Sequence, residues 1–315
     1  KRGRKVLDAV IADTTPARLA QAMVGERLAT AGALRREPRV AGDPVLVLDQ
    51  VDLVGAGTGR RPRGTTATGV GPDSGLRPDG GPRLALSGIS LTVREGEIVA
   101  IAGVAGNGQQ ALADLLSGLA AADRGRITVA GQPLAARPRD WIDAGVARIP
   151  VDRLHAAVVG DASVAENAVL TRLPRWLVDR DEMQRIARRI VDGYDVRLRS
   201  IQQPIRSLSG GNIQKFIVGR ELRDKPTLVI ACQPTWGLDI GAVAFVHQQL
   251  LAARARGAAV LLISEDLDEI FALADRVAVI HGGRLGPLRE TAEWTPEAIG
   301  LAMAGSAGED STVAA

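Results

Sequence analysis

The arrangement of short apolar runs constrains the fold of this chain more than any other feature. From residue 97 onwards, apolar runs of four to six residues alternate with segments of helical pattern. Strands that are buried on both faces of a parallel sheet have this continuous apolar character. The expected strands are 98–102, 146–149, 227–232, 258–263 and 276–280. The pattern predicts an α/β fold with helices on both faces of a parallel sheet.

Helical patterns lie between these strands, and the chain before them is of a different kind. Helices are expected at 109–119, 242–256 and 266–274, and residues 163–222 are expected to be mainly helical. Two further strands are expected at 45–53 and 89–93. Residues 55–82 consist largely of Gly, Pro, Arg and Thr, and they lack the apolar side chains needed to form a core. We therefore expect this segment to be a mobile loop.

Composition excludes several classes of protein. The chain has 315 residues, of which 46% are hydrophobic and 24% charged, and no apolar run approaches the roughly 18 residues of a membrane span. Its single cysteine, Cys232, excludes a disulfide scaffold and favours a reducing compartment. Residues 1–90 carry a net charge of +5 and the remainder −2, with eight aromatic residues in all. Low charge on the core and few aromatic residues argue against a nucleic-acid partner.

An internal repeat indicates a tandem organisation. When the chain is shifted by 280 positions, eight identities fall within the first 25 residues, including Thr15-Pro16 on Thr295-Pro296. Two similar helix starts could also produce this match, because Thr followed by Pro is a common helix beginning. The interpretation we favour makes residues 1–40 the tail of a preceding domain plus a connector. The absence of an initiator Met fits a fragment, and residues 301–315 are expected to be a flexible tail.

A glycine-rich segment directly follows the strand 98–102. Its spacing, Gly103-Val-Ala-Gly-Asn-Gly108, is that of a phosphate-binding P-loop, although glycines after a strand can also form a plain tight turn. A P-loop would continue with Lys and Ser or Thr, whereas this chain has two glutamines. The candidate nucleotide-binding residues are Gly103, Gly106, Asn107, Gly108, Gln109 and Gln110.

Three further motifs follow the loop in a fixed order. Leu208-Ser-Gly-Gly-Asn212 comes first, and Pro-Thr-Trp-Gly-Leu-Asp239 and Ile-Ser-Glu-Asp-Leu-Asp-Glu269 follow at the ends of apolar strands. With these motifs the chain resembles the ATP-binding subunits of ABC transporters. The resemblance is strongest to the second nucleotide-binding domain of tandem-domain importers for simple sugars and nucleosides. Ala165-Glu-Asn167 and Gln233-Pro-Thr235 favour the nucleoside branch.

The resemblance implies an architecture and a set of partners. The fold would be an α/β P-loop ABC-type nucleotide-binding domain over 41–300, with an antiparallel β-subdomain and a helical subdomain at about 155–222. The chain would be an energy-coupling subunit on the cytoplasmic side of the membrane. Its cofactors would be ATP and Mg²⁺, the latter mainly at the partner-domain site. Its partners would be a first nucleotide-binding domain, of the same or a second subunit, and transmembrane permease subunits.

Several positions depart from the family pattern where chemistry is expected. Gln109 stands in place of the phosphate-binding Lys, Cys232 in place of the Mg²⁺-anchoring Asp and Gln233 in place of the catalytic Glu. Glu265 replaces the switch His, and Val151 occupies a position where the family has Glu or Gln. A positioned acid or base is worth roughly 10²–10⁴ in rate, and a cation on the phosphoryl group roughly 10³–10⁵. We therefore expect no catalytic residue in this chain's own P-loop site, and no metal ligand.

The signature motif keeps the residues that the family requires. In ABC dimers each ATP lies between the P-loop of one domain and the signature of the other, so this motif would serve the partner's ATP. The expected signature residues are Ser209, Gly210, Gly211 and Asn212. Asp239 would lie in the loop that contacts the partner domain. Asp152 and Arg153 are expected to form a local ion pair rather than a catalytic pair.

Two other functions compete with this interpretation. A structural or regulatory dimerisation module without a role in ATP hydrolysis is possible in principle, but such a module need not keep phosphate-facing glycines. A soluble ABC-type ATPase of translation or DNA repair is the second alternative. The low charge of the core and the scarcity of aromatic residues argue against it.

Overall fold

A computed structural model describes residues 41–54, 84–172 and 179–305. The expected tail at 1–40, the expected loop at 55–82 and the end of the chain after residue 305 lie outside these described residues. The chain divides into two compact units. Of the described residues, the first unit contains 151–172, 179–220 and 234–252, and the second contains 41–54, 84–150, 221–233 and 253–305.

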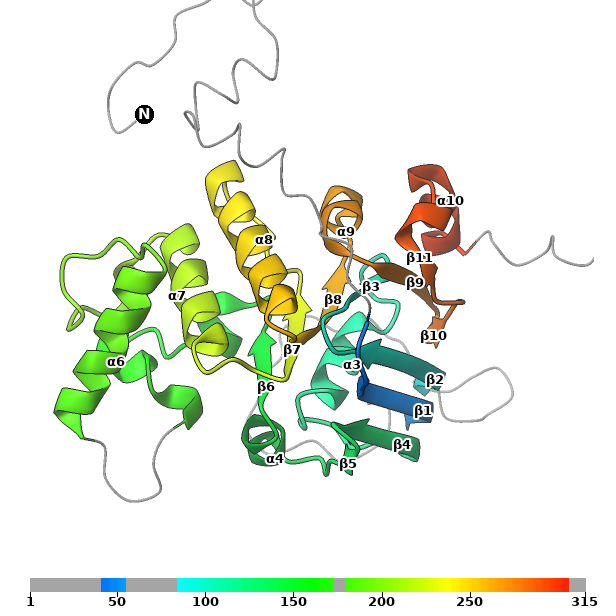
Figure 1. The fold of residues 1–315 in the computed structure, drawn as a ribbon, viewed down its shortest axis with the longest axis horizontal. Helices are drawn as coiled ribbons and strands as arrows, with labels where there is room; N and C mark the ends of the chain where they lie inside the picture. Colours follow the sequence, from blue (N-terminus) through cyan, green and yellow to red (C-terminus); the bar gives the residue numbers. More distant parts are fainter. Residues whose placement is uncertain (1–40, 55–83, 173–178, 306–315) are drawn as a thin grey trace, which may run out of the picture. The chain divides into compact units, whose positions relative to one another are not determined.

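A mainly parallel sheet forms the centre of the second unit (Figure 1). Its strand order is β10-β9-β3-β8-β7-β6, and β11 pairs with β9 outside this path. Strands β3, β7 and β8 are buried at every residue, which agrees with their apolar sequences. The strands are β3 (Ile98–Ala102), β6 (Val146–Ile149), β7 (Leu228–Cys232), β8 (Ala259–Ser264), β9 (Arg276–His281), β10 (Arg284–Leu285) and β11 (Arg289–Glu290).

A second, antiparallel sheet belongs to the same unit and has the order β2-β1-β4-β5. Its strands are β1 (Pro44–Val54), β2 (Leu84–Arg94), β4 (Arg124–Val129) and β5 (Gln132–Pro133). The register of β1 shifts between Leu48 and Val51, where Gln50 has a φ of +47°. Gly125 of β4 crosses this bulge so closely that a Cβ there would lie 2.4 Å from the Gln50 carbonyl oxygen. Glycine is therefore required at this crossing.

The helices of the second unit are short. They are α3 (Gln109–Leu115), α4 (Pro138–Asp143), α9 (Leu267–Leu273) and α10 (Pro296–Met303), with the 3₁₀ turn η5 (Thr291–Glu293). The expected helix 109–119 ends early, because Gly118 adopts a φ of +68° and donates its N–H to the Leu115 carbonyl. Each helix that was expected in this part of the chain is thus present, with α3 shorter than expected.

The first unit is helical. Its elements are η2 (Arg153–Ala157), α5 (Val164–Asn167), η3 (Leu170–Arg172), α6 (Arg180–Gly193), η4 (Ile205–Ser207), α7 (Gly210–Leu222) and α8 (Ile240–Ala255). The boundary of the unit falls inside α7, after Arg220, and inside α8, after Ala252. The fully buried Asn167 holds the segment 159–163 in place. Its side chain forms hydrogen bonds with Val159 N and O, Ala162 O and Ser163 O at 2.9–3.2 Å. The buried Arg220 donates to the Asn167 carbonyl at 3.2 Å. No described helix is long and apolar enough to span a bilayer.

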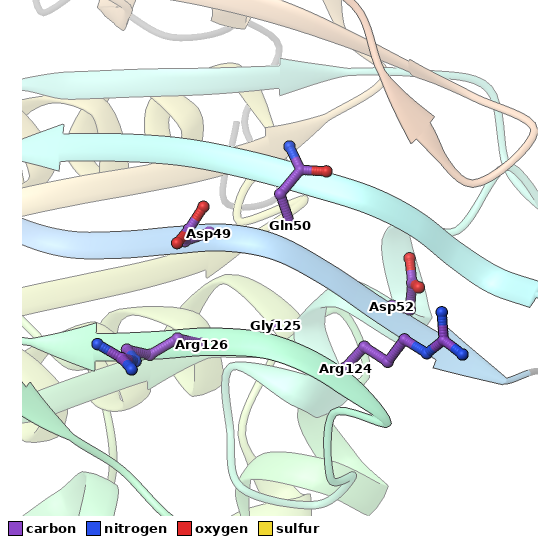
Figure 2. Close-up of a pocket in the computed structure, with 6 residues that line it drawn as sticks. All are labelled: Asp49, Gln50, Asp52, Arg124, Gly125 and Arg126. Atoms are coloured by element: carbon purple, nitrogen blue, oxygen red, sulfur yellow. The ribbon is translucent and has the colours of Figure 1, made fainter.

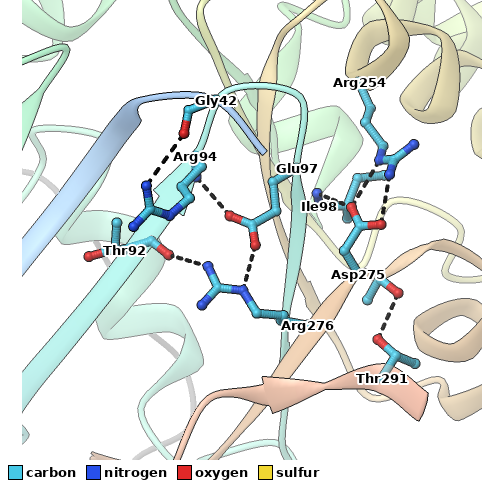
Figure 3. Close-up of polar contacts among 10 residues, drawn as sticks. Gly42, Thr92, Arg94, Glu97, Ile98, Arg254, Asp275, Arg276 and Thr291 are labelled. Carbon is cyan, nitrogen blue, oxygen red and sulfur yellow. Dashed lines mark hydrogen bonds and ion pairs between the residues drawn. The ribbon is translucent and has the colours of Figure 1, made fainter. Parts of the chain in front are cut away.

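Buried charges join the amino ends of strands β3 and β9 in the second unit (Figure 3). The Glu97 carboxylate accepts a hydrogen bond from Arg276 Nε at 2.5 Å, and Glu97 is only 4% exposed. The Asp275 carboxylate accepts from Arg254 at 2.8 and 2.9 Å and from the Ile98 N–H at 2.8 Å. These ion pairs stabilise the edge of the sheet formed by the amino ends of the strands. The glycine loop begins at the opposite edge, at the carboxyl end of β3.

Candidate functional site

The glycine loop follows β3 in the second unit, and its backbone needs glycine at particular positions. A Cβ on Gly103 would lie 2.6 Å from Ile280 Cγ2, and one on Gly108 would lie 3.0 Å from the Ala85 carbonyl oxygen. Gly106 and Gly108 have φ values of +90° and +109°, a region that disfavours other residues. The loop therefore has the close approaches and the left-handed turns that its sequence pattern predicts.

The side chain of Gln109 crosses the loop and bonds its backbone on both sides. Its Nε2 donates to the Val104 carbonyl at 2.7 Å, and its Oε1 accepts from the Asn107 N–H at 3.0 Å. The Asn107 side chain donates to Val104 O at 2.9 Å and accepts from Gly282 N at 2.9 Å. The backbone N–H groups of such a loop could bind a phosphate. One of them, the Asn107 N–H, already forms a hydrogen bond within the chain.

The neighbouring candidate residues are an amide and a thiol. Gln110 Nε2 donates to Asp114 Oδ1 at 2.8 Å. Burial raises the pKa of the Cys232 thiol to about 12, although the positive charge of Arg148 opposes this shift. A neutral thiol is a poor ligand for a cation that prefers oxygen. Over the described ranges, no cluster of three or more His, Cys, Asp or Glu side chains could hold a metal ion.

Two further candidate site residues, Gln233 and Glu265, contact each other. Gln233 Nε2, after β7, donates to Glu265 Oε1, after β8, at 2.9 Å. The Gln233 backbone also donates to the Ile263 carbonyl at 2.7 Å, with a φ of +41°. The structure thus brings the two positions together at the carboxyl ends of adjacent strands, as an amide bonded to a carboxylate.

The signature segment, Ser209–Asn212, begins α7 in the first unit. Asn212 Nδ2 donates to Ser209 Oγ at 2.9 Å, and Asn212 Oδ1 accepts from the Arg197 N–H at 2.8 Å. Ser209 and Gly210 are exposed, whereas Gly211 and Asn212 are half-buried. The segment therefore presents its serine and first glycine to solvent, and the Asn212 amide fixes its geometry.

The candidate partner-contact residue lies next to this segment. Asp239 Oδ1 accepts from the Ala242 N–H at 3.0 Å and caps α8, while its Oδ2 lies 3.6 Å from the position of a Cβ on Gly211. The half-buried Val151 begins the same unit. The structure therefore places the signature residues and Asp239 in one unit, and the glycine loop, Cys232, Gln233 and Glu265 in the other.

The expected ion pair between Asp152 and Arg153 is wrong. Asp152 Oδ2 contacts His155 Nδ1 at 2.8 Å, and backbone hydrogen bonds, chiefly from His155, hold the pKa of this carboxyl below its usual value. Arg153 turns away and donates to the Trp236 carbonyl oxygen. Neither this contact nor the bonds of Gln109 across its loop has a signal in the sequence, because each joins a side chain to a backbone atom.

A shallow hollow on the antiparallel sheet is not a convincing active site (Figure 2). It is lined by Asp49, Gln50, Asp52, Arg124, Gly125 and Arg126. Asp49 stands opposite Arg126, and Asp52 stands opposite Arg124, in the register of β1 and β4. Opposite charges on facing positions are typical of a solvated sheet surface.

The comparisons with known proteins agree on a single family. A family model described as "ABC transporter" matches residues 86–236. The guanosine import ATP-binding protein NupO of Bacillus subtilis is 37% identical over 97% of this chain and 56% of its own length. The glucose import ATP-binding protein TsgD13 of Haloferax volcanii is 37% identical over 99% of this chain and 54% of its own length. The chain thus spans about half the length of these curated relatives.

Solved structures show the same fold at lower identity. An ATP-binding cassette of an ABC transporter, MJ1267 in its ADP conformation, matches with a TM-score of 0.62 and 19% identity, over 83% of this chain and 95% of that one. The dimeric cassette MJ0796 matches with a TM-score of 0.62 and 17% identity, over 78% of this chain and 98% of that one. At these identities the likeness establishes the fold alone.

Proposed function

The chain belongs to the ATP-binding proteins of the ABC transporter family, and on that premise we propose that it is the energy-coupling part of an importer. Domains of this family bind ATP and Mg²⁺, and their fold is the one described above. The relatives at 37% identity are named for guanosine and glucose import, which supports a nucleoside or a simple sugar as the solute. The repeat at an offset of 280 residues supports the position of a second domain in a tandem.

We infer that this chain's own P-loop does not hydrolyse ATP. The observation that carries this proposal is the side chain of Gln109, which bonds both sides of the loop in the position of the phosphate-binding lysine. The neutral thiol of Cys232 and the amide of Gln233 add no carboxylate for a metal or an attacking water. The loop keeps the backbone shape of a P-loop without the charges of one.

The signature segment gives the chain its proposed part in catalysis. Ser209 and Gly210 are exposed, so the P-loop of a first domain, from the same or a second subunit, can face them. The serine hydroxyl and the backbone N–H groups would then bind the terminal phosphate of the ATP held by that domain. The remaining partners are transmembrane permease subunits, and the chain would act at the cytoplasmic side of the membrane.

Transport assays on the full-length protein with its membrane partners test this division of roles. Ser209→Arg and Gly210→Asp place bulk or negative charge where the partner's phosphate would lie, so each should remove nearly all transport. Gln109→Ala loses two neutral hydrogen bonds within the loop, each worth about 0.5–1.5 kcal/mol. Together they amount to about a five- to 150-fold effect, so this variant should keep more transport than either signature variant.

The asymmetry between these variants is the decisive result. Equal and severe loss in Gln109→Ala would mean that this chain's P-loop is chemically active. Near-normal transport in Gly210→Asp would remove the role of the signature and favour a structural or regulatory module instead.

A further inference from the structure

The loop 234–239, which precedes helix α8, lies beside the signature segment within the first unit. At its start, Gln214 of α7 is 1% exposed and donates from Nε2 to the Pro234 carbonyl at 2.7 Å. At its end, Asp239 approaches Gly211, with Oδ2 3.6 Å from the position of a Cβ. Both ends of the loop therefore contact the helix that carries the signature.

The two central residues of the loop, Trp236 and Gly237, pack little side-chain surface against the unit. Trp236 is 67% exposed, and Gly237 has no side chain and a φ of +65°. A turn is closed here by the Leu238 N–H, which donates to the Thr235 carbonyl at 3.1 Å. Contacts to the backbone of Trp236 therefore bear directly on the position of this turn.

Arg153 makes such a contact. Its Nη2 donates to the carbonyl oxygen of Trp236, in the middle of the turn. Its Nη1 lies 3.4 Å from the position of a Cβ on Gly210, the first residue of α7. A single guanidinium therefore contacts the loop and lies next to the start of the signature helix. A charged donor also gives a stronger bond to a carbonyl than a neutral donor does.

We propose that Arg153 is a positioning residue that holds the loop 234–239 in place beside the signature segment. Its functional consequence rests on the proposed function, in which Ser209, Gly210 and Asp239 meet the ATP site of a partner domain. Arg153 acts through the Trp236 backbone, so the identity of the Trp236 side chain is of little importance to this role. The close approach of its guanidinium to Gly210 ties the position of the loop to the position of the signature.

Hydrogen exchange of the Leu238 amide in the purified chain tests the structural half of the proposal. In Arg153→Met the amide should exchange about tenfold faster, because loss of a hydrogen bond from a charged donor frees the turn. Arg153→Lys keeps a charged donor and should restore most of the protection. Arg153→Gln repeats the test with a polar, uncharged side chain of the same length as methionine if the Met variant lowers the unfolding midpoint.

Two control variants separate this role from general effects. Trp236→Ala removes the exposed ring but keeps the carbonyl, so the Leu238 exchange rate should stay within about twofold of the native rate. Arg189→Met, on the exposed face of α6, makes the same change of charge and should also leave this rate unchanged. Native exchange in both Arg153→Met and Arg153→Gln would overturn the proposal, and so would equal acceleration in Trp236→Ala.

ATP turnover by the assembled transporter tests the functional half. Arg153→Met should lower kcat about tenfold through misplacement of the loop, with little change in the KM for ATP, because the partner domain holds most of the nucleotide. If Ser209→Arg leaves turnover intact, the proposed function fails. The hydrogen-exchange rates then still test whether Arg153 holds the loop in place. If Ser209→Arg abolishes turnover and Arg153→Met has native turnover, the functional role of Arg153 is overturned alone.

Discussion

We propose that Cys232 and Gln109 stand where the family places an anion and a cation, and both side chains are neutral in this chain. Cys232 is the last residue of β7, and burial raises the pKa of its thiol. The side-chain amide of Gln109 forms hydrogen bonds to the backbone of its own loop. Gln233 is likewise engaged, through its bond to Glu265. In the proposed function, the P-loop site would thus have internal hydrogen bonds in place of charges. Such bonds hold a loop in shape but stabilise little developing charge.

The thiol of Cys232 provides a test of this description. Its pKa of about 12 in the folded chain lies above the usual value of 9.0 for a cysteine thiol, so the fold favours the neutral form. Its contribution to stability is complete below pH 9 and is lost as the pH rises towards 12. Iodoacetamide at pH 8 should therefore leave the native chain unlabelled and label it rapidly in denaturant. Because the chain has one cysteine, mass spectrometry reads the result directly, and rapid labelling of the native chain would contradict it.

Helix α7 carries the signature segment, and its packing in the first unit depends on one small residue. A Cβ on Gly219 would lie 2.8 Å from the ring of Tyr194 and 2.9 Å from Ile190 Cγ2. The Tyr194 ring itself meets Phe245 of α8 edge-on, with centroids 6.2 Å apart. Lys215 of α7 lies 4.9 Å above the same Phe245 ring. The glycine lets the signature helix approach this aromatic cluster closely.

Replacement of Gly219 by alanine sets two effects against each other. Alanine is better than glycine within a helix by about 1 kcal/mol, whereas overpacking costs about 1–3 kcal/mol. Because both contacts fall below 3.0 Å, we expect Gly219→Ala to lower the free energy of unfolding by about 1 kcal/mol. Gly300→Ala is the control, since no described atom lies within 4 Å of its Cβ position in α10. It should stabilise the chain in urea titrations, and an equal gain in Gly219→Ala would contradict the packing described.

Elements could be predicted from the sequence where their apolar pattern was continuous. The run Ile98–Ala102 gives a strand with the expected bounds, because a central parallel strand is apolar on both faces. The end of α3 could not be placed, because the backbone at Gly118 decides it locally. Nor does periodicity show that 234–252 joins the unit of 151–220, because that grouping depends on tertiary contacts.

At the scale of the whole molecule, buried ion pairs tie distant parts of the sequence together. Arg254 and Asp275 have side chains that are 6% and 22% exposed, and Asp275 also holds the first N–H of β3. Glu97 and Arg276, which also form an ion pair within the second unit, are 179 positions apart in the sequence. The sequence does not reveal these pairs, because a charged residue at a strand end looks the same whether it is solvated or paired.

Loss of the pair between Arg254 and Asp275 should destabilise the chain strongly. Breaking a buried ion pair typically costs about 3–5 kcal/mol, and an exposed pair at most about 1 kcal/mol. We expect Arg254→Met to lower the free energy of unfolding by about 3 kcal/mol. Arg139→Met removes the exposed pair with Asp143, whose side chains are 52% and 55% exposed, and should cost less than about 1 kcal/mol. Equal effects of the two variants on the urea midpoint would contradict the role given to the buried pair.

The fold expected from the sequence is confirmed by the cassette structures, whereas the roles of the site residues remain predictions. The sequence indicated which positions lack the family's charges, because Lys, Asp and Glu are recognisable by type. It could not indicate that Gln109 bonds across its own loop or that Arg153 reaches the loop 234–239, because both depend on backbone geometry.

Phosphate release from Mg²⁺-ATP by the purified chain tests the central claim most directly. The P-loop has Gln109 in place of a cation, and Cys232 and Gln233 supply no carboxylate. We therefore expect release at the background rate, both for the native chain and for Gln109→Lys, which restores the cation alone. Metal-dependent turnover by the native chain, abolished by Gly106→Val or Gly108→Val, would contradict the account.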